Sequence, residues 1–274
     1  MPDPLTPPPA DAGVTGELRH DTTVGATPLT TWPTAAGRSA AHAAVQVSRR
    51  IGAHGALAAT LAIGVVAVFL LAFLASRVYD GVTERDGVAG LDLPVLHAAM
   101  GMRSPLASWV AATVAVGFGP VGMPIVALAA ILLLALRRRS WTPVILVAAA
   151  GIGSLAMTIA GKDIIHRHRP SLANAIPPFE HSPSFPSGHT LNATVIAGVV
   201  AYLILLRRRT AAGRTVTVVA AVAIAIVVGL TRILLGAHWF TDVLAGWLLG
   251  AAWLGIVITA HRLYLTARER GAPR

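Results

Sequence analysis

Six long stretches without a charged residue constrain this chain more than any other feature. A helix needs about 20 apolar residues to cross the ~30 Å hydrocarbon core of a bilayer, and most of these stretches fit one crossing each. They cover residues 51–76, 104–136, 141–161, 181–206, 215–231 and 243–260. Only 12% of the 274 residues are charged, whereas a soluble domain carries about 25%. The sequence therefore predicts an all-α membrane protein and excludes a soluble binding module or a wholly disordered chain.

The second stretch, residues 104–136, is long enough for one crossing or two. Its centre, residues 117–124, is rich in the helix breakers Gly and Pro. Short arginine-rich loops favour the cytoplasm, and all the basic clusters fall on one side only if the chain crosses six times. These clusters are Arg49–Arg50, Arg137–Arg139, Arg207–Arg209 with Arg214, and residues 262–274. We therefore expect interfacial helices on the outer face from Leu93 to about Phe118, then one crossing that ends near Leu136.

Charge and composition along the chain complete the predicted topology. The cytoplasmic segments of this arrangement carry the whole net charge of +10, so orientation explains the basic excess and no nucleic-acid partner is needed. Residues 1–48, rich in Pro, Ala and Thr, are expected to form a disordered cytoplasmic tail. Residues 49–262 form the predicted six-helix membrane domain, and residues 263–274 a basic cytoplasmic tail. Both termini would then lie in the cytoplasm of a multi-pass plasma-membrane protein.

Ionisable residues gather at the predicted outer ends of crossings three to six. They occupy residues 162–170, 186–189 and 231–242. Each charge would cost about 2.5–3.5 kcal/mol at mid-membrane, so such residues indicate function by default. Three groups that meet on one membrane face predict an active site. Because the chain has no cysteine, a thiol nucleophile and cysteine metal sites are excluded.

The first two groups suit an anion. Lys162 and Arg169 are seven residues apart, which would place both cations on one side of a helix. Lys162 is the only lysine among 22 basic residues, although an interfacial snorkelling cation is an equal alternative. Ser187 and Gly188 precede a long apolar helix, whose free N–H groups attract phosphate. A plain helix cap, with His189 as an interfacial histidine, is the alternative for this group.

The third group suits nucleophilic catalysis. His238 and Asp242 are four residues apart and would be neighbours on a helix. A carboxylate bonded to one imidazole nitrogen fixes the tautomer and leaves the other nitrogen free as a nucleophile. A bend at Gly236 could bring Arg232 to the same oxyanion. The alternative is an ordinary pair on a helix surface.

Together, these groups resemble the three signature motifs of the type 2 phosphatidic acid phosphatase superfamily, over roughly residues 90–260. The resemblance implies a six-helix membrane bundle with the site at the outer leaflet. It implies that His238 is the nucleophile that forms a phosphohistidine, Asp242 its orienting partner, and His189 the general acid. The implied phosphate cradle consists of Lys162, Arg169, Ser187, Gly188 and Arg232.

Other positions bear on this resemblance. Thr231 stands where the family usually has Ser before the third-motif arginine. Arg167 matches a frequent extra arginine of bacterial members, whereas the roles of His166 and His168 stay open.

The resemblance predicts a phosphatase that needs no metal or other cofactor. Asp80, Glu84 and Asp86, acidic residues of the predicted outer side, are far in sequence from the site, so no carboxylate cluster is expected to bind Mg²⁺. The expected substrate is a lipid phosphate in the bilayer, with undecaprenyl pyrophosphate favoured over phosphatidic acid by family analogy. A lipid phosphotransferase that uses an alcohol acceptor, and a non-enzymatic membrane transporter, are the alternatives.

Overall fold

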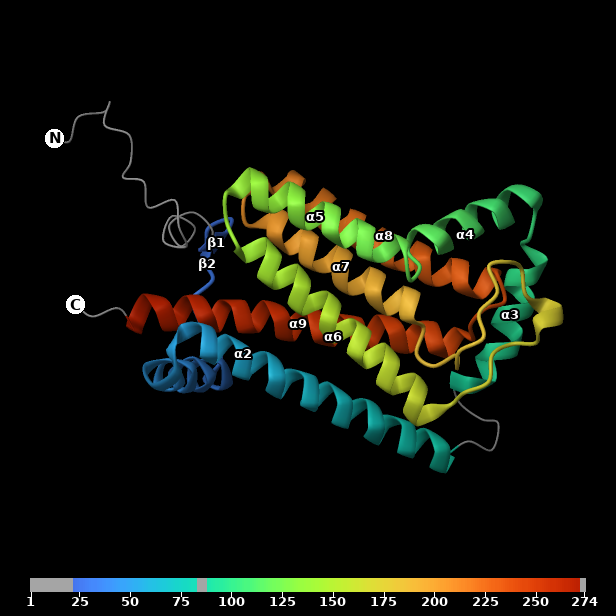
Figure 1. Ribbon diagram of the computed structural model, residues 1–274, viewed down its shortest axis with the longest axis horizontal. Coiled ribbons are helices and arrows are strands. Elements are labelled where there is room, and N and C mark those ends of the chain that lie inside the picture. The colour runs from blue at the N-terminus through green and yellow to red at the C-terminus, as the bar shows by residue number, and fades with distance from the viewer. Residues whose placement is uncertain (1–21, 83–87, 272–274) are drawn as a thin grey trace.

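The protein is an elongated bundle of helices, as the sequence predicts (Figure 1). The computed structural model describes residues 22–82 and 88–271. The longer helices are α2 (Ala35–Val82), α5 (Gly122–Arg138), α6 (Thr142–Ile165), α7 (Gly188–Leu205), α8 (Ala211–Leu234) and α9 (Phe240–Gly271). The shorter ones are η1 (Val88–Leu91), α3 (Asp92–Gly101), α4 (Pro105–Gly117) and η2 (Leu172–Asn174). Strands β1 (Thr23–Val24) and β2 (Thr27–Pro28) pair antiparallel.

The predicted break within the second apolar stretch is confirmed. Helix α4 ends at Gly117, α5 begins at Gly122, and the two are bent by 61°. Pro120, which lies between them, has no N–H to continue the helix. Within the described ranges, five helices are long and apolar enough to span a membrane, or six if the bent pair counts as one span. Helices α3 and α4 cover the segment from Leu93 to about Phe118 that was expected to form interfacial helices.

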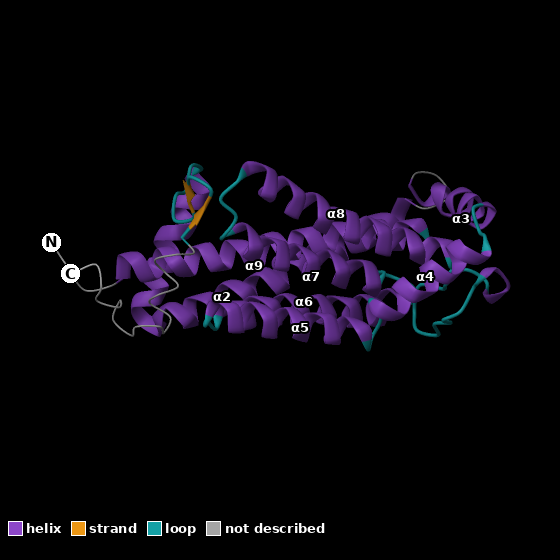
Figure 2. Cartoon of the chain, turned by 90° about the horizontal axis from the view of Figure 1, so that it is seen from above, coloured by secondary structure: helices purple, strands orange, loops and turns teal. Residues whose placement is uncertain are grey.

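The long helices lie side by side along the long axis of the molecule (Figure 2). Helix α9 packs against α2 and α7, and α7 also packs against α6 and α8. Figure 1 shows the α5–α6 and α7–α8 connections and the C-terminal part of α9 at the end of the bundle where β1 and β2 lie. These segments carry arginine clusters, and we call this end the basic end. Helix α3 and the loop before α7 lie at the opposite end, which we call the α3 end (Figure 1).

The two predicted tails differ from the structure. Helix α2 begins at Ala35, so the described part of the expected disordered tail is ordered, whereas residues 1–21 lie outside the described residues. Ala41 and Ala44 are buried against Leu263 of α9. The Pro/Ala/Thr-rich composition of this segment did not predict its order, because composition does not show which distant residues a segment packs against. Residues 263–271 of the expected basic tail are instead the last part of α9, and residues 272–274 lie outside the described residues.

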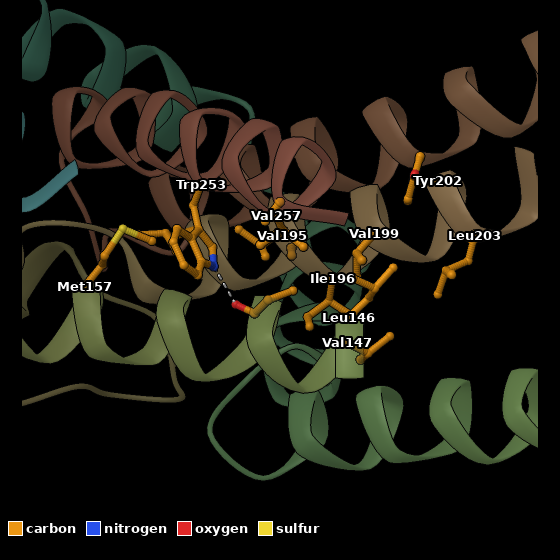
Figure 3. Packing of buried hydrophobic residues seen from close by; sticks show 14 of the residues in the cluster. Leu146, Val147, Met157, Val195, Ile196, Val199, Tyr202, Leu203, Trp253 and Val257 are labelled. Atoms are coloured by element: carbon orange, nitrogen blue, oxygen red, sulfur yellow. Dashed lines mark hydrogen bonds between the residues drawn. The ribbon is translucent and has the colours of Figure 1, made fainter. Parts of the chain in front are cut away.

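The core of the bundle is built around a tryptophan on α9 (Figure 3). Trp253 is 1% exposed, and its indole N–H donates to the carbonyl of Ala150 at 3.0 Å. Gly153 permits this packing, because a Cβ there would lie 2.2 Å from the indole ring. Truncating such a buried Trp to Ala typically costs about 3–5 kcal/mol. The contact therefore fixes α6 against α9 and holds the start of α9 near the end of α6.

The outside of the bundle is strongly apolar. On α8, Val216, Val219, Val222 and Leu230 are each at least half exposed. A soluble protein rarely exposes such a continuous apolar surface. This surface fits the hydrocarbon of a bilayer, and the chain is a multi-pass membrane protein.

Candidate active site

All the predicted site residues lie at the α3 end of the bundle. They come from the end of α6, the loop from 166 to 187, the start of α7, the end of α8 and the start of α9. Several polar side chains here are deeply buried: Ser187, Arg232, His238 and Asp242 are 0% exposed as residues, and His189 is 9% exposed. Buried polar groups of this kind need partners, since burial without a partner is costly. The partners define the site.

His238 lies immediately before α9 rather than on it. Asp242, in the first turn of α9, accepts from the backbone N–H of Trp239 at 3.0 Å and so acts as a helix cap. Its other contact in this turn is with the His238 ring, where Nδ1 lies 3.5 Å from Oδ2. The cap turn, and not a helix face, therefore brings the two residues close together, but the predicted hydrogen bond is not formed, because His238 Nδ1 has no hydrogen-bond partner among the described residues.

A tight turn after α8 places His238 beside Arg232. The carbonyl of Arg232 accepts from the N–H groups of both Ala237 (3.0 Å) and His238 (3.3 Å). Gly236 has a φ of 69°, and a Cβ there would lie 2.4 Å from the carbonyl oxygen of Asn174. The bend predicted at Gly236 is thus present, and only glycine fits it.

Lys162 and Arg169 do converge, but not along one helix. Helix α6 ends at Ile165, and His166 follows with a left-handed φ of 49°. Arg169 therefore lies in the loop, so the two-turn spacing argument was wrong. Both cations instead reach one segment: Lys162 donates to the hydroxyl of Ser182 at 3.0 Å and to the carbonyl of Pro183, and Arg169 donates to the carbonyl of Ser182 at 2.7 Å.

Ser187 and Gly188 form the N-terminus of α7 through packing rather than side-chain capping. The Ser187 hydroxyl makes no cap hydrogen bond and accepts from the Thr190 hydroxyl at 2.9 Å. The Ser187 N–H donates to the carbonyl of Asp242 at 3.1 Å. A Cβ at Gly188 would lie 2.8 Å from Thr158 of α6. The start of α7 is thereby held against both α6 and α9.

His189 is oriented by α4. Its Nε2 lies 3.1 Å from the carbonyl oxygen of Ala115, which can only accept, so Nε2 carries the proton. Its Nδ1 is then directed into the site, 3.5 Å from a carboxylate oxygen of Glu180. Helix α4, predicted only as interfacial, thus positions this histidine.

Glu180 is a site residue that the sequence analysis missed. Its carboxylate contacts Arg232, Arg169 (2.7 Å), His189 (3.5 Å) and His238 (3.6 Å). Burial raises the pKa of this carboxyl, but the contact with His238 and the charge of Arg232 outweigh burial and hold the pKa below its usual range. No motif contains this residue, so the sequence offered only the presence of an acid in the loop.

Arg167, which the sequence analysis noted as an extra arginine, makes contacts behind Asp242 that were not predicted. Its guanidinium lies 2.5 Å from Oδ1 of Asp242 and 2.5 Å from Oδ2 of Asp92, on α3. The Asp92 carboxylate also accepts from the N–H of Thr241 at 2.9 Å. Burial lowers the pKa of Arg167, but the charge of Asp242 and the bond to Asp92 raise it above its usual value. A chain of contacts therefore runs from Asp92 through Arg167 and Asp242 to His238.

The remaining loop histidines are outside this cradle. The side chains of His166 and His168 are exposed. The backbone carbonyl of His168, rather than its side chain, makes a contact here: it accepts from the indole N–H of Trp239 at 2.8 Å.

The site is built for an oxyanion. Two guanidiniums and two imidazoles surround one position, and burial in a low-dielectric setting strengthens their hold on negative charge. Burial lowers the pKa of Arg169, but the Glu180 and Asp242 charges oppose this. Across the described parts of the chain, no group of three or more His, Asp or Glu side chains is arranged to hold a metal ion.

Comparisons with known proteins agree on one relationship. Residues 142–264 match the PAP2 superfamily model, and this range contains all three motifs. Phosphatidylglycerophosphatase B of Bacillus subtilis (strain 168) is 36% identical over 115 residues, which are 41% of this chain and 55% of that protein. The aligned region thus spans about half the length of that relative.

A solved structure extends the match. It is the crystal structure of a transmembrane PAP2 type phosphatidylglycerolphosphate phosphatase from Bacillus subtilis. It superposes with a TM-score of 0.61 at 26% identity, over 70% of this chain and 93% of that one. The likeness therefore extends well beyond the three motifs.

Proposed function

We propose that this chain is a member of the PAP2 superfamily, whose model matches residues 142–264, and that it is a membrane lipid phosphatase working through a phosphohistidine. The observation that carries the proposal is the position of the Glu180 carboxylate. Arg169, Arg232 and the two histidines surround this oxyanion as they would surround a phosphate. Nucleophile, acid and cations thus meet at one oxyanion position, which is what phosphoryl transfer requires.

The first step forms a phosphorus–nitrogen bond. His238 Nε2 faces the oxyanion position, whereas Nδ1 faces Asp242. Arg169 Nη1 donates to Nε2 at 3.1 Å, and since a guanidinium only donates, the ring proton lies on Nδ1. The Nε2 lone pair attacks phosphorus once the bound phosphate takes over this Arg169 contact. As the bond from phosphorus to the ester or pyrophosphate oxygen breaks, protonated His189 gives its Nδ1 proton to that oxygen.

The second step releases phosphate. His189, now neutral, takes a proton from water, and the water oxygen attacks the phosphohistidine. The phosphorus–nitrogen bond breaks and returns the electron pair to His238. Arg169, Arg232 and Lys162 neutralise the equatorial oxygens in both steps. The proposed steps use these side chains alone and call for no metal or other cofactor.

The orientation proposed for the enzyme puts the site at the outer face of the plasma membrane. Arginine clusters at the basic end would face the cytoplasm, as short basic loops generally do. The α3 end would then face outward, with both termini in the cytoplasm.

We propose a lipid with a terminal phosphate or pyrophosphate as substrate. A site at the end of an apolar bundle favours an amphiphile over a soluble ester. Undecaprenyl pyrophosphate and phosphatidic acid are the candidates favoured by the sequence, and the name of the Bacillus relative supports phosphatidylglycerophosphate as a third. An alcohol in place of water in the second step would make the protein a lipid phosphotransferase.

The test is phosphate release by the purified full chain in detergent with EDTA present. The three lipids are compared, and His238→Ala runs beside the wild type. His97→Ala is the matched control, because His97 is an exposed histidine on α3. We expect release that is lost only in His238→Ala. If the folded wild type releases no phosphate from any lipid, hydrolysis is ruled out, and transfer to an alcohol is assayed next.

A further inference from the structure

We propose that Glu180 determines specificity: its carboxylate fills the phosphate position when substrate is absent, so that only phosphates with more than one negative charge displace it. This inference rests on the proposed function, because it concerns which phosphates reach the same site. It assigns a role to a residue that lies outside the three motifs.

The geometry of the carboxylate is that of a bound oxyanion. Oε1 contacts Arg232 and lies 3.5 Å from Nδ1 of His189. Oε2 lies 2.7 Å from Arg169 and 3.6 Å from Nε2 of His238. Each oxygen therefore meets one arginine and one histidine. A phosphate cannot approach the proposed nucleophilic nitrogen while the carboxylate lies there.

The loop that carries Glu180 is anchored on both sides of it. The N–H of Ile176 donates to the carbonyl of Leu235 at 2.8 Å, and the N–H of Ser184 donates to the carbonyl of Arg167 at 2.8 Å. Between these anchors, the Glu180 side chain is 22% exposed and its neighbour Phe179 is 51% exposed. The Glu180 side chain is therefore mostly buried but borders solvent, on a loop held at both sides.

The carboxylate also protects the buried cation. Arg232 has no exposed surface, and two of its guanidinium nitrogens, Nε and Nη1, have no hydrogen-bond partner. A buried charge without a counter-ion is strongly unfavourable. Any group that displaces Glu180 must therefore replace its negative charge at Arg232, and a dianion with three free oxygens can also reach the unpartnered nitrogens.

The charge of a phosphate decides whether it can displace the Glu180 carboxylate from this position. A tethered carboxylate acts at an effective concentration of about a millimolar or more. A phosphodiester carries one charge and two free oxygens, like the carboxylate, and gains little by replacing it. A terminal phosphate carries about −1.5 to −2 at pH 7 and has three acceptor oxygens. Glu180 would thereby keep the phosphodiester headgroups of the surrounding bilayer out of the site and admit terminal phosphates.

The experiment measures binding and turnover in Glu180→Gln. Inorganic phosphate binding is followed by calorimetry in detergent, and phosphatidylglycerol in mixed micelles serves as the phosphodiester competitor. We expect phosphate affinity to rise about tenfold or more, because the tethered competitor is lost. Inhibition by phosphatidylglycerol should become stronger by a similar factor. Asp163→Asn is the control, because Asp163 is an exposed acid at the end of α6 and its loss removes the same charge.

The outcomes separate this inference from the proposed function. If Glu180→Gln binds phosphate and phosphatidylglycerol as the wild type does, Glu180 does not compete for the site and the inference fails. Weaker phosphate binding in a folded variant also overturns it, because Glu180 would then assist binding. If neither protein hydrolyses a lipid but the variant binds phosphate more tightly, the inference holds and the phosphatase proposal fails.

A measurement on the wild type guards against a variant that does not fold. Methyl phosphate and dimethyl phosphate differ little in size but differ by about one charge near neutral pH. We expect methyl phosphate to bind at least about tenfold more tightly. Equal affinities would overturn the inference without any substitution.

Discussion

The two ends of the bundle use arginine in different ways. At the α3 end, Arg167, Arg169 and Arg232 pair with carboxylates, and Arg169 also donates to backbone carbonyls. At the basic end, Arg262 donates to the carbonyls of Leu29 and Thr31 at 2.8 and 2.7 Å, and Arg138 donates to the carbonyl of Leu203. Guanidiniums paired with carboxylates are held in place before any substrate arrives.

Both ends of the bundle hold arginine clusters, so an arginine cluster alone does not make an anion site. The α3 end adds burial, two histidines directed at one point and acids that pair with Arg167, Arg169 and Arg232. Preorganised charge of this kind needs no rearrangement during reaction and is the main source of catalytic stabilisation. The predictions below test whether the two ends differ in function as they differ in structure.

The largest effect is expected at the nucleophile. If His238 is the proposed nucleophile, His238→Ala should lower phosphate release by about 10³-fold or more, since it removes the nitrogen that forms the proposed intermediate. The matched variant at the basic end is His261→Ala, which removes another buried histidine, one that contacts Tyr202. It should lower thermal stability but leave the rate per folded molecule within a few-fold. Equal losses of rate in both variants would remove the functional distinction between the ends.

A smaller loss is expected behind Asp242. Arg167→Gln leaves Asp92 and Asp242 without their shared cation, so kcat should fall by about 10- to 100-fold. Arg138→Gln, the control at the basic end, should change kcat less than about twofold. Steady-state rates in detergent measure both variants. An Arg167→Gln enzyme with wild-type kcat would show that this network does not orient the catalytic pair.

Asp92→Asn should have the next smaller effect. It keeps the shape of the side chain but weakens the hold on Arg167, so we expect kcat to fall by about tenfold with little change in KM. The double variant with Arg167→Gln should lose less than the product of the single losses, because both act through one contact. Multiplicative losses would mean that Asp92 acts independently of Arg167.

The smallest effect concerns stability against pH. The pKa of Glu180 is lower in the folded protein than in the unfolded chain. The ionised carboxylate therefore stabilises the folded state, and this stabilisation is fully present above the unfolded pKa of about 4.3. It is lost as pH falls through the folded pKa. In phosphate-free detergent buffer, Glu180→Gln should melt a few degrees below the wild type from pH 5 to 8, and this gap should narrow below pH 4. A gap that widens on acidification would contradict the depressed pKa.

Much of the fold could be predicted because its signals are local. Apolar stretches gave the long helices, and the Gly and Pro residues near 120 gave the break between α4 and α5. The order of the tail at Ala41 could not be predicted, because it depends on packing against Leu263, more than 200 residues away.

The sequence by itself determined the residue types of the site and the end of the bundle where they meet, since motif spacing and charge placement are properties of the chain. Tertiary structure alone decided how they are held. Glu180 enters the cradle because the loop between Ile176 and Ser184 is anchored to α8 and to Arg167. Asp92 contacts Arg167 across a separation of 75 residues, and Arg167 in turn contacts Asp242 of the proposed catalytic pair. Such contacts carry no periodic signal, because their energy exists only once the chain has folded.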